Sequence, residues 1–235
     1  MFRSSAHNLR SIDESENMDW DPINHYKDVA VAERYDQERF SGLPGRVFNA
    51  LEQRALRRAL ARIPRSLTVM DLPCGTGRLA ETLLGEGFQV VGVDISAAML
   101  AVAERKLKRY GSSFQTRVGD VRELARVESA TYDVALCARV LMHFPLQQQI
   151  EFLGSVATLT KGTVVFSQSL STPYQRMRRR IKKLLGNPPP AMYPITESQL
   201  RSLLKGAGLR EVRRFRISRP ISEGMFVVAE HLQHA

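Results

Sequence analysis

Short apolar runs alternate with longer amphipathic stretches over most of the chain. The apolar runs, rich in Val, Leu and Ile, have the length of buried strands and are residues 66–72, 89–94, 114–120, 132–138, 162–169, 209–218 and 224–232. The stretches with apolar residues at helical spacing are 50–63, 78–87, 96–111, 122–127, 147–160 and 197–208. Ser96 and Thr196 are placed as helix N-caps. This alternation predicts βαβ units around a mostly parallel sheet, covered on both faces.

The last two strands are separated by only a few residues, which favours an antiparallel pair at one edge of the sheet. We therefore expect an α/β fold with seven strands, one of them antiparallel. The chain has 235 residues, enough for one sizeable core. We predict an N-terminal leader and helical cap over residues 1–45, and one domain over 46–235 with an insertion at 171–195.

Length, cysteines and charge narrow the class of protein. No run of 18 apolar residues is present, and the N-terminus has no apolar segment typical of a secretory signal. With only Cys74 and Cys137, a disulfide framework and a four-cysteine zinc site are excluded, and we expect a cytoplasmic protein without a metal. The net charge is +10, which attracts anions such as nucleic acid, a membrane surface or an acidic small molecule.

A glycine-rich turn follows the first predicted strand. Gly75-Thr-Gly77-Arg-Leu-Ala satisfies the loose G-x-G-x-x-G/A pattern, which by itself fits NAD. Three acids change the interpretation, because Asp71, Asp94 and Asp120 end the first three strands. Parallel strands end at one rim of an open sheet, where ligands bind.

These features form a recognisable series. The segments MDLPCGTGR, VVGVDISAAML, VGD and YDVALCARVLMHF resemble the successive motifs of class I S-adenosylmethionine-dependent methyltransferases. The likeness is greatest to the small-molecule type that includes enzymes of ubiquinone and menaquinone biosynthesis. It implies a Rossmann-like class I methyltransferase fold and S-adenosyl-L-methionine as cofactor. The family loop usually has a glycine where this chain has Pro73, so any turn with positive φ must be made at Gly75 or Gly77.

The resemblance also implies roles for individual residues. Asp71 would face the cofactor's ammonium group, Asp94 its ribose hydroxyls and Asp120 its adenine amino group. The other expected cofactor contacts are Pro73, Cys74, Gly75 and Gly77 in the loop, Ile95 and Met99 beside adenine, the amide of Val121, and Cys137 and Ala138 beside the methionine portion. From the cap we expect Tyr26, Tyr35 and Arg46, with Arg46 suited to a carboxylate. Simpler roles remain open: each Asp as a helix cap, Met99 and the cysteines as core residues, and the tyrosines as packing.

On the acceptor side, His143 in VLMHF is the candidate general base for a hydroxyl acceptor, or else a structural residue. Arg139 would bind an acidic substrate group or form an ion pair within the fold. The insertion carries a predicted helix over residues 174–185 with an apolar stripe of Tyr174, Met177, Ile181, Leu184 and Leu185. Its cations are Arg176, Arg178, Arg179, Arg180, Lys182 and Lys183. Such a helix suits a lid over the substrate, with Tyr174 as a contact, or an anionic membrane surface, or packing on the core.

The sequence thus predicts O-methylation of a small or lipid-linked acceptor by in-line displacement. The alternatives are a nucleic-acid methyltransferase, an NAD-dependent oxidoreductase and a non-catalytic binding protein. Nucleic acid is less favoured because no Asn/Asp-Pro-Pro-aromatic motif is present: Asn187 precedes three prolines without an aromatic residue.

Overall fold

The computed structural model describes residues 29–40, 42–171, 176–177, 180–181, 184, 186, 192–218 and 224–232. Tyr26 and Tyr174 lie outside these residues. Within them, none of the helices is long and apolar enough to cross a membrane.

A seven-stranded sheet forms the centre, with the strand order β3-β2-β1-β4-β5-β7-β6. The strands are β1 (Thr68–Asp71), β2 (Gln89–Asp94), β3 (Phe114–Val118), β4 (Tyr132–Cys137), β5 (Thr160–Ser169), β6 (Leu209–Arg216) and β7 (Gly224–His231). β7 pairs antiparallel with both β5 and β6, whereas the other pairs are parallel. This confirms the expected α/β fold with one antiparallel strand and an antiparallel pair at one edge.

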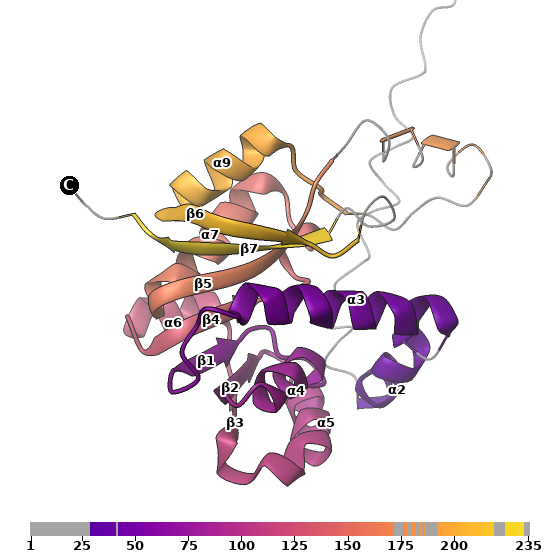
Figure 1. Cartoon of the computed structure of the whole chain (residues 1–235), viewed down its shortest axis with the longest axis vertical. Helices are drawn as coiled ribbons and strands as arrows, with labels where there is room; N and C mark the ends of the chain where they lie inside the picture. The colour runs from indigo at the N-terminus through magenta and orange to yellow at the C-terminus, as the bar shows by residue number, and fades with distance from the viewer. Residues whose placement is uncertain are drawn as a thin grey trace, which may run out of the picture.

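Helices cover both faces of the sheet (Figure 1). They are α2 (Val29–Phe40), α3 (Leu43–Leu60), α4 (Arg78–Gly85), α5 (Ala97–Leu107), α6 (Val121–Val127), α7 (Leu146–Thr158) and α9 (Glu197–Gly206), with the short 3-10 helices η1 (Lys108–Ser113) and η2 (Leu141–His143). One core cluster lies under α6, α7 and α9, and the other under α3, α4 and α5. The apolar positions on both sides of each central strand are therefore buried, as in parallel sheets generally.

Local signals explain where the helices begin. The Ser96 hydroxyl accepts the Met99 N–H at 3.2 Å, and Thr196 forms a capping box with Gln199. Both predicted caps are confirmed. α3 begins at Leu43 rather than near residue 50, because Pro44 at the first turn is a strong helix start. The predicted boundary between residues 45 and 46 consequently falls inside α3.

The inserted segment leaves the sheet and returns at a single point. Leu170 and Ile195 form a parallel bridge, and Ser171 N–H donates to Ile195 O at 2.9 Å. Tyr193 N–H donates to Met142 O at 2.8 Å, which ties the returning chain to η2. Both ends of the segment are thus fixed beside the 3-10 helix that carries His143.

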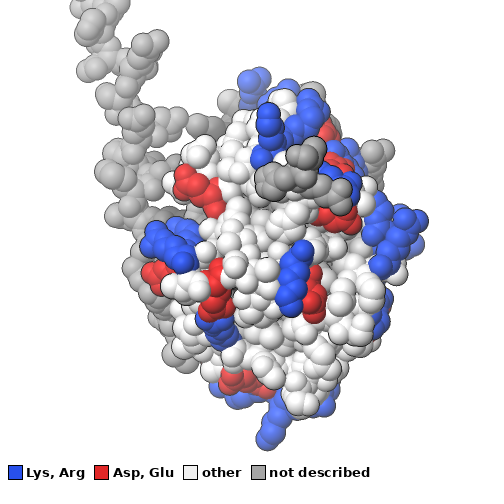
Figure 2. Space-filling view, turned by 90° about the vertical axis from the view of Figure 1, so that its left-hand side faces the viewer, with Lys and Arg blue, Asp and Glu red and all other residues white. Residues whose placement is uncertain are grey.

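Although the formal net charge is +10, not every face of the molecule is predominantly basic. Figure 2 shows the side that lies to the left in Figure 1, where basic and acidic side chains are interspersed between large uncharged areas. On this side the charges thus form local clusters rather than a continuous basic surface.

Candidate active site

The glycine loop joins β1 to α4 and lies against the end of β2. Cys74 N–H donates to Val93 O at 2.9 Å, and Gly77 N–H donates to Cys74 O at 3.1 Å. Gly75 and Gly77 have φ of 55° and 73°, so the loop makes its positive-φ turns at the two predicted positions. A Cβ on Gly77 would lie 2.8 Å from Leu107 Cδ1, whereas one on Gly75 would meet nothing within 4 Å. Gly77 is thus needed for packing against α5, and the backbone at Gly75 borders open space.

Asp94 holds this loop to the second strand. Its Oδ2 accepts the Gly75 N–H at 2.8 Å, and its Oδ1 accepts the Ser96 N–H at 2.9 Å. Burial raises the pKa of Asp94, while these amide donors act in the opposite direction. The Ile95 amide is a third backbone donor to this carboxylate, and a carboxylate has about four lone-pair sites, so Asp94 has the capacity to accept from a ligand hydroxyl as well.

Asp71 is the most deeply buried of the three predicted strand-end acids. It is 1% exposed, and its Oδ2 has no hydrogen-bond partner among the described residues. Burial raises its pKa well above the usual value, Arg78 lowers it and Asp94 raises it further. A buried acceptor without a donor is costly, so this oxygen fits a cationic or hydrogen-bond-donating ligand group.

Asp120 is engaged more fully by the protein itself. It caps α6 by accepting the Arg122 N–H at 2.9 Å, and its Oδ2 lies 2.6 Å from Arg122 Nη2. Arg122 lowers the pKa of Asp120, so the carboxylate is ionised at neutral pH. The helix-cap alternative is thus realised here, and a contact of Asp120 with adenine remains a prediction.

The remaining predicted cofactor residues differ in exposure. Ile95 is half-buried, and the buried ones are Cys74, Met99, Val121, Cys137 and Ala138. Burial raises the pKa of both cysteine thiols, which are therefore not nucleophilic thiolates at neutral pH. Pro73 follows Leu72 through a cis peptide bond.

A buried ion-pair network, which sequence reasoning missed, links α3 to the site. Glu52 is 1% exposed, and its Oε2 lies 2.5 Å from Arg78 Nη2 at the start of α4. Its Oε1 lies 3.3 Å from Arg139 Nη1, directly after β4. Arg139 thus forms the ion pair that was the alternative to substrate binding. The available signal was an acid among the apolar positions of α3, beside Leu51, Ala55 and Leu56.

The chain turns sharply at Arg139. Its φ is 62°, a conformation that non-glycine residues seldom adopt, and its N–H donates to Ser167 Oγ at 2.7 Å. Such backbone outliers cluster at functional sites. The turn separates the buried residues Cys137 and Ala138 from η2.

Helix α2 connects the cap to the glycine loop. Asp36 accepts the Thr76 hydroxyl at 2.7 Å through Oδ1, and its Oδ2 lies 2.9 Å from Lys106 Nζ on α5. Tyr35, half-buried, is on the same helix. Arg46 is exposed in the first turn of α3 and forms no ion pair with the described residues, so its role toward a carboxylate remains a prediction.

His143 lies half-buried at the end of η2, and its N–H donates to Val140 O at 3.0 Å. The residue after His143, Phe144, is hydrogen-bonded to a pair of buried glutamine side chains. Gln168 Nε2 donates to Gln149 Oε1 at 2.7 Å, and Gln149 Nε2 donates to Phe144 O at 2.7 Å. The structure therefore holds His143 on a fixed element, beside both ends of the insertion.

Comparison with known proteins identifies a methyltransferase domain. Residues 69–162 match the model of a methyltransferase domain. Over 150 residues the chain is 33% identical to the chloroplastic magnesium protoporphyrin IX methyltransferase of Arabidopsis thaliana, covering 63% of this chain and 48% of that protein. Over 100 residues it is 37% identical to a ubiquinone biosynthesis O-methyltransferase of Burkholderia orbicola, covering 42% of each. The matched regions span less than half the length of these curated relatives.

Solved structures agree on the fold. The magnesium protoporphyrin IX methyltransferase of Synechocystis PCC 6803 with bound SAH superposes with a TM-score of 0.71 at 21% identity, covering 90% of this chain and 98% of that one. A 1,6-didemethyltoxoflavin-N1-methyltransferase from Burkholderia thailandensis gives 0.63 at 21% identity, covering 87% and 89%. The chain therefore contains a methyltransferase domain over residues 69–162 and has the Rossmann-like fold of these solved methyltransferases.

Proposed function

We propose that the protein transfers the methyl group of S-adenosyl-L-methionine to an oxygen of a small acceptor. The observation that carries this proposal is the rim of the sheet, where the buried Oδ2 of Asp71 has no hydrogen-bond partner in the described part of the chain and Asp94 accepts the Gly75 N–H of the glycine loop. S-adenosylmethionine bears an ammonium and a sulfonium group and no phosphate, so acids suit it better than a phosphate cradle.

Each part of the cofactor has a candidate partner in this chain. Asp71 Oδ2 receives the ammonium group, the backbone at Gly75 and Gly77 flanks the methionine and ribose portions, and Asp94 accepts from the ribose hydroxyls. Asp120, the Val121 amide, Ile95 and Met99 surround adenine. Pro73, Cys74, Cys137 and Ala138 complete the wall beside the methionine portion, and Tyr35 and Arg46 close it from the cap.

When bound, the cofactor supplies a methyl group on a sulfonium, which is an activated leaving group. The chain's own residues have to align the acceptor, exclude water and take a proton from a hydroxyl acceptor. His143 is our candidate for that proton transfer because it follows β4 and lies in the hydrogen-bonded 3-10 helix η2. Names of relatives support an oxygen acceptor, since one is a ubiquinone biosynthesis O-methyltransferase.

Isothermal titration with S-adenosylhomocysteine and with NAD tests the cofactor. We expect the first to bind and the second not to bind. A methyl-transfer screen over quinols, phenols, porphyrin carboxylates, lipids and RNA then tests the acceptor. Binding of NAD alone would overturn the proposal, and transfer only to RNA would replace the small acceptor with nucleic acid. Binding of S-adenosylhomocysteine without transfer to any acceptor would favour a non-catalytic binding protein.

A second proposal concerns the basic insertion and places the protein in the cytoplasm with peripheral contact to anionic membrane through residues 174–185. Met177, Ile181 and Leu184 are in helical conformation and are 54%, 48% and 85% exposed. Arg176 and Arg180 are exposed as well. Tyr174, Leu185 and the other four cations lie outside the described residues. Apolar side chains open to solvent next to cations suit an anionic lipid interface.

Co-sedimentation with phosphatidylserine and phosphatidylcholine vesicles tests this contact. We expect binding to the anionic vesicles only, weakened by salt and lost in the triple variant Ile181→Asp, Leu184→Asp, Arg180→Ser. A matched variant with exposed changes elsewhere, Val127→Asp, Leu232→Asp, Arg62→Ser, should bind like the wild type. Failure to bind anionic vesicles at low salt would leave the segment as a substrate lid.

A further inference from the structure

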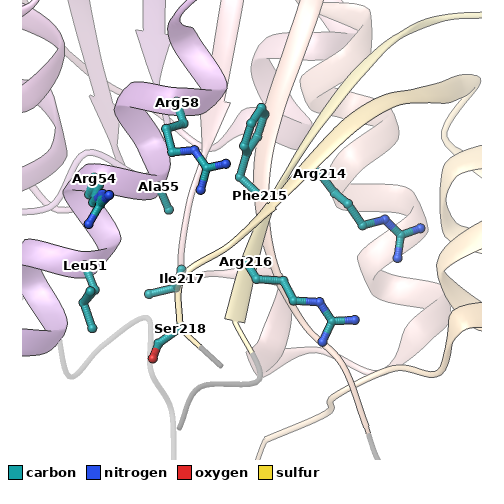
Figure 3. Close-up of a pocket in the computed structure, with 9 residues that line it drawn as sticks. All are labelled: Leu51, Arg54, Ala55, Arg58, Arg214, Phe215, Arg216, Ile217 and Ser218. Carbon is teal, nitrogen blue, oxygen red and sulfur yellow. The ribbon is translucent and has the colours of Figure 1, made fainter. Parts of the chain in front are cut away.

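An open groove with a volume of about 380 Å³ lies between helix α3 and the edge strand β6 (Figure 3). Its lining residues are Leu51, Arg54, Ala55 and Arg58 from α3, and Arg214, Phe215, Arg216, Ile217 and Ser218 from β6 and its end. None of the predicted cofactor residues is among them. The volume lies in the range of small-molecule sites, roughly 300–1,000 Å³.

The cations of this groove are not equivalent. Arg214 is neutralised by carboxylates of Glu197 and Glu211, at 2.7 and 2.6 Å. Arg54 and Arg58 lie one turn apart on α3, are exposed, and form no ion pair with any residue that the structure describes. Figure 3 shows Arg58 reaching toward the groove, whereas Arg214 and Arg216 extend away from α3. Arg216 forms no ion pair with the described residues either, but it points away from α3, so two uncompensated guanidinium groups border the groove from the side of α3.

The other wall is apolar and aromatic. The Phe215 ring lies 5.3 Å from Arg58 Cζ and 5.8 Å from Arg213 Cζ, measured to the ring centroid. Ile217 continues this wall on the side of β6, and Leu51 and Ala55 add apolar surface on the side of α3. Guanidinium groups beside an aromatic ring recognise a planar acid well, because they bind the anion bidentately and offer stacking to its body.

The groove opens at the rim of the sheet that holds the predicted cofactor residues. β6 runs parallel to β5, since β7 is antiparallel to both, so Ser218 lies at the carboxyl end of the sheet. Leu51 precedes Glu52, which contacts Arg78 and Arg139. One turn of α3 thus borders the groove and also carries Glu52, the centre of the buried ion-pair network.

We propose that this groove is a binding site for a small amphiphilic acid. Its carboxylate, sulfonate or phosphate lies between Arg54 and Arg58, and its flat apolar body packs on Phe215 and Ile217. A small molecule is favoured over nucleic acid because the lining cations without an ion pair, Arg54, Arg58 and Arg216, surround one small cavity and do not form a long track. The assignment stands independently of methyl transfer.

The probe is 2-naphthoate, with uncharged 2-naphthamide as its isosteric control, titrated into the full chain by calorimetry at low salt. We expect naphthoate to bind at least tenfold more tightly than naphthamide. The double variant Arg54→Ser, Arg58→Ser should lose at least tenfold in naphthoate affinity. The control Arg62→Ser, Lys108→Ser removes two exposed charges elsewhere and should stay within twofold of the wild type.

Three results would overturn the assignment: no naphthoate binding to the wild type, equal binding of naphthamide, or equal losses in the two double variants. Titration with S-adenosylhomocysteine separates this site from the proposed function. The groove variant should retain wild-type affinity for it, and failure of the wild type to bind it would count against the methyltransferase proposal alone.

Discussion

The buried network around Glu52 leads to the most specific prediction of stability. Glu52→Gln keeps the size of the side chain and removes the charge that faces two arginines. Arg78, whose side chain is 11% exposed, would then lose the carboxylate with which it forms its buried ion pair. Breaking such a pair costs about 3 kcal/mol at the lower end of measured values. Arg139 is 27% exposed, so solvent screening makes the loss of its ion pair with Glu52 a small part of this cost.

That cost converts to a measurable shift in melting temperature. With an unfolding entropy typical of a chain of this length, about 3 kcal/mol lowers Tm by about 6 °C. Thermal unfolding followed by circular dichroism, with urea unfolding in parallel, measures it. Glu86→Gln is the matched control, since Glu86 bridges Arg57 and Arg65 at the surface, and should shift Tm far less.

A double-mutant cycle with Arg78→Met isolates the interaction, because Arg78→Met removes the cation whose carboxylate partner is lost in Glu52→Gln. The double variant should be more stable than the sum of the two single effects predicts. A Glu52→Gln variant that melts within 1 °C of the Glu86→Gln control would refute the reasoning.

Three further predictions concern the rim. Asp94→Ala should weaken S-adenosylhomocysteine binding about 100-fold in calorimetry, because the ribose loses hydrogen bonds to a charged acceptor worth about 3 kcal/mol; unchanged affinity would displace the proposed site. His143→Ala should leave that affinity intact while lowering kcat by roughly 10²–10⁴, and equal damage to both would indicate a structural residue. Because burial raises the pKa of Asp71, folding favours its protonated form, and stability is lost as pH rises above the usual value of 3.8 toward the raised one. Asp71→Asn should therefore raise Tm at pH 8, lose this advantage near pH 4, and abolish binding of the cofactor's ammonium group; a lower Tm at pH 8 would contradict the burial argument.

The local sequence pattern was sufficient to predict the helices and strands and part of the candidate site. Strand and helix periodicity, the caps at Ser96 and Thr196, and the glycine turn depend on neighbours in sequence, so the sequence alone determined them. Parallel pairing then brings the ends of β1 and β2 to one rim, which is why the contact between Asp94 and Gly75 follows from topology. Pro44 in the sequence also indicates a helix start, although our prediction placed the start of α3 too late.

Other features depended on which helix faces lie against which strands. Glu52 reaches Arg78 and Arg139 across 26 and 87 residues, and no local motif marks a pair at such separations. Asp120 could be recognised as a strand-end acid, but its capture by Arg122 depends on side-chain rotamers. The groove beside Phe215 exists because α3 packs against β6, in an arrangement where Arg54 and Arg58 form no ion pair with the described residues. Sequence determined the periodic elements because their forces act over a few residues; tertiary structure decided these long-range charge pairings, since they arise only when distant elements pack.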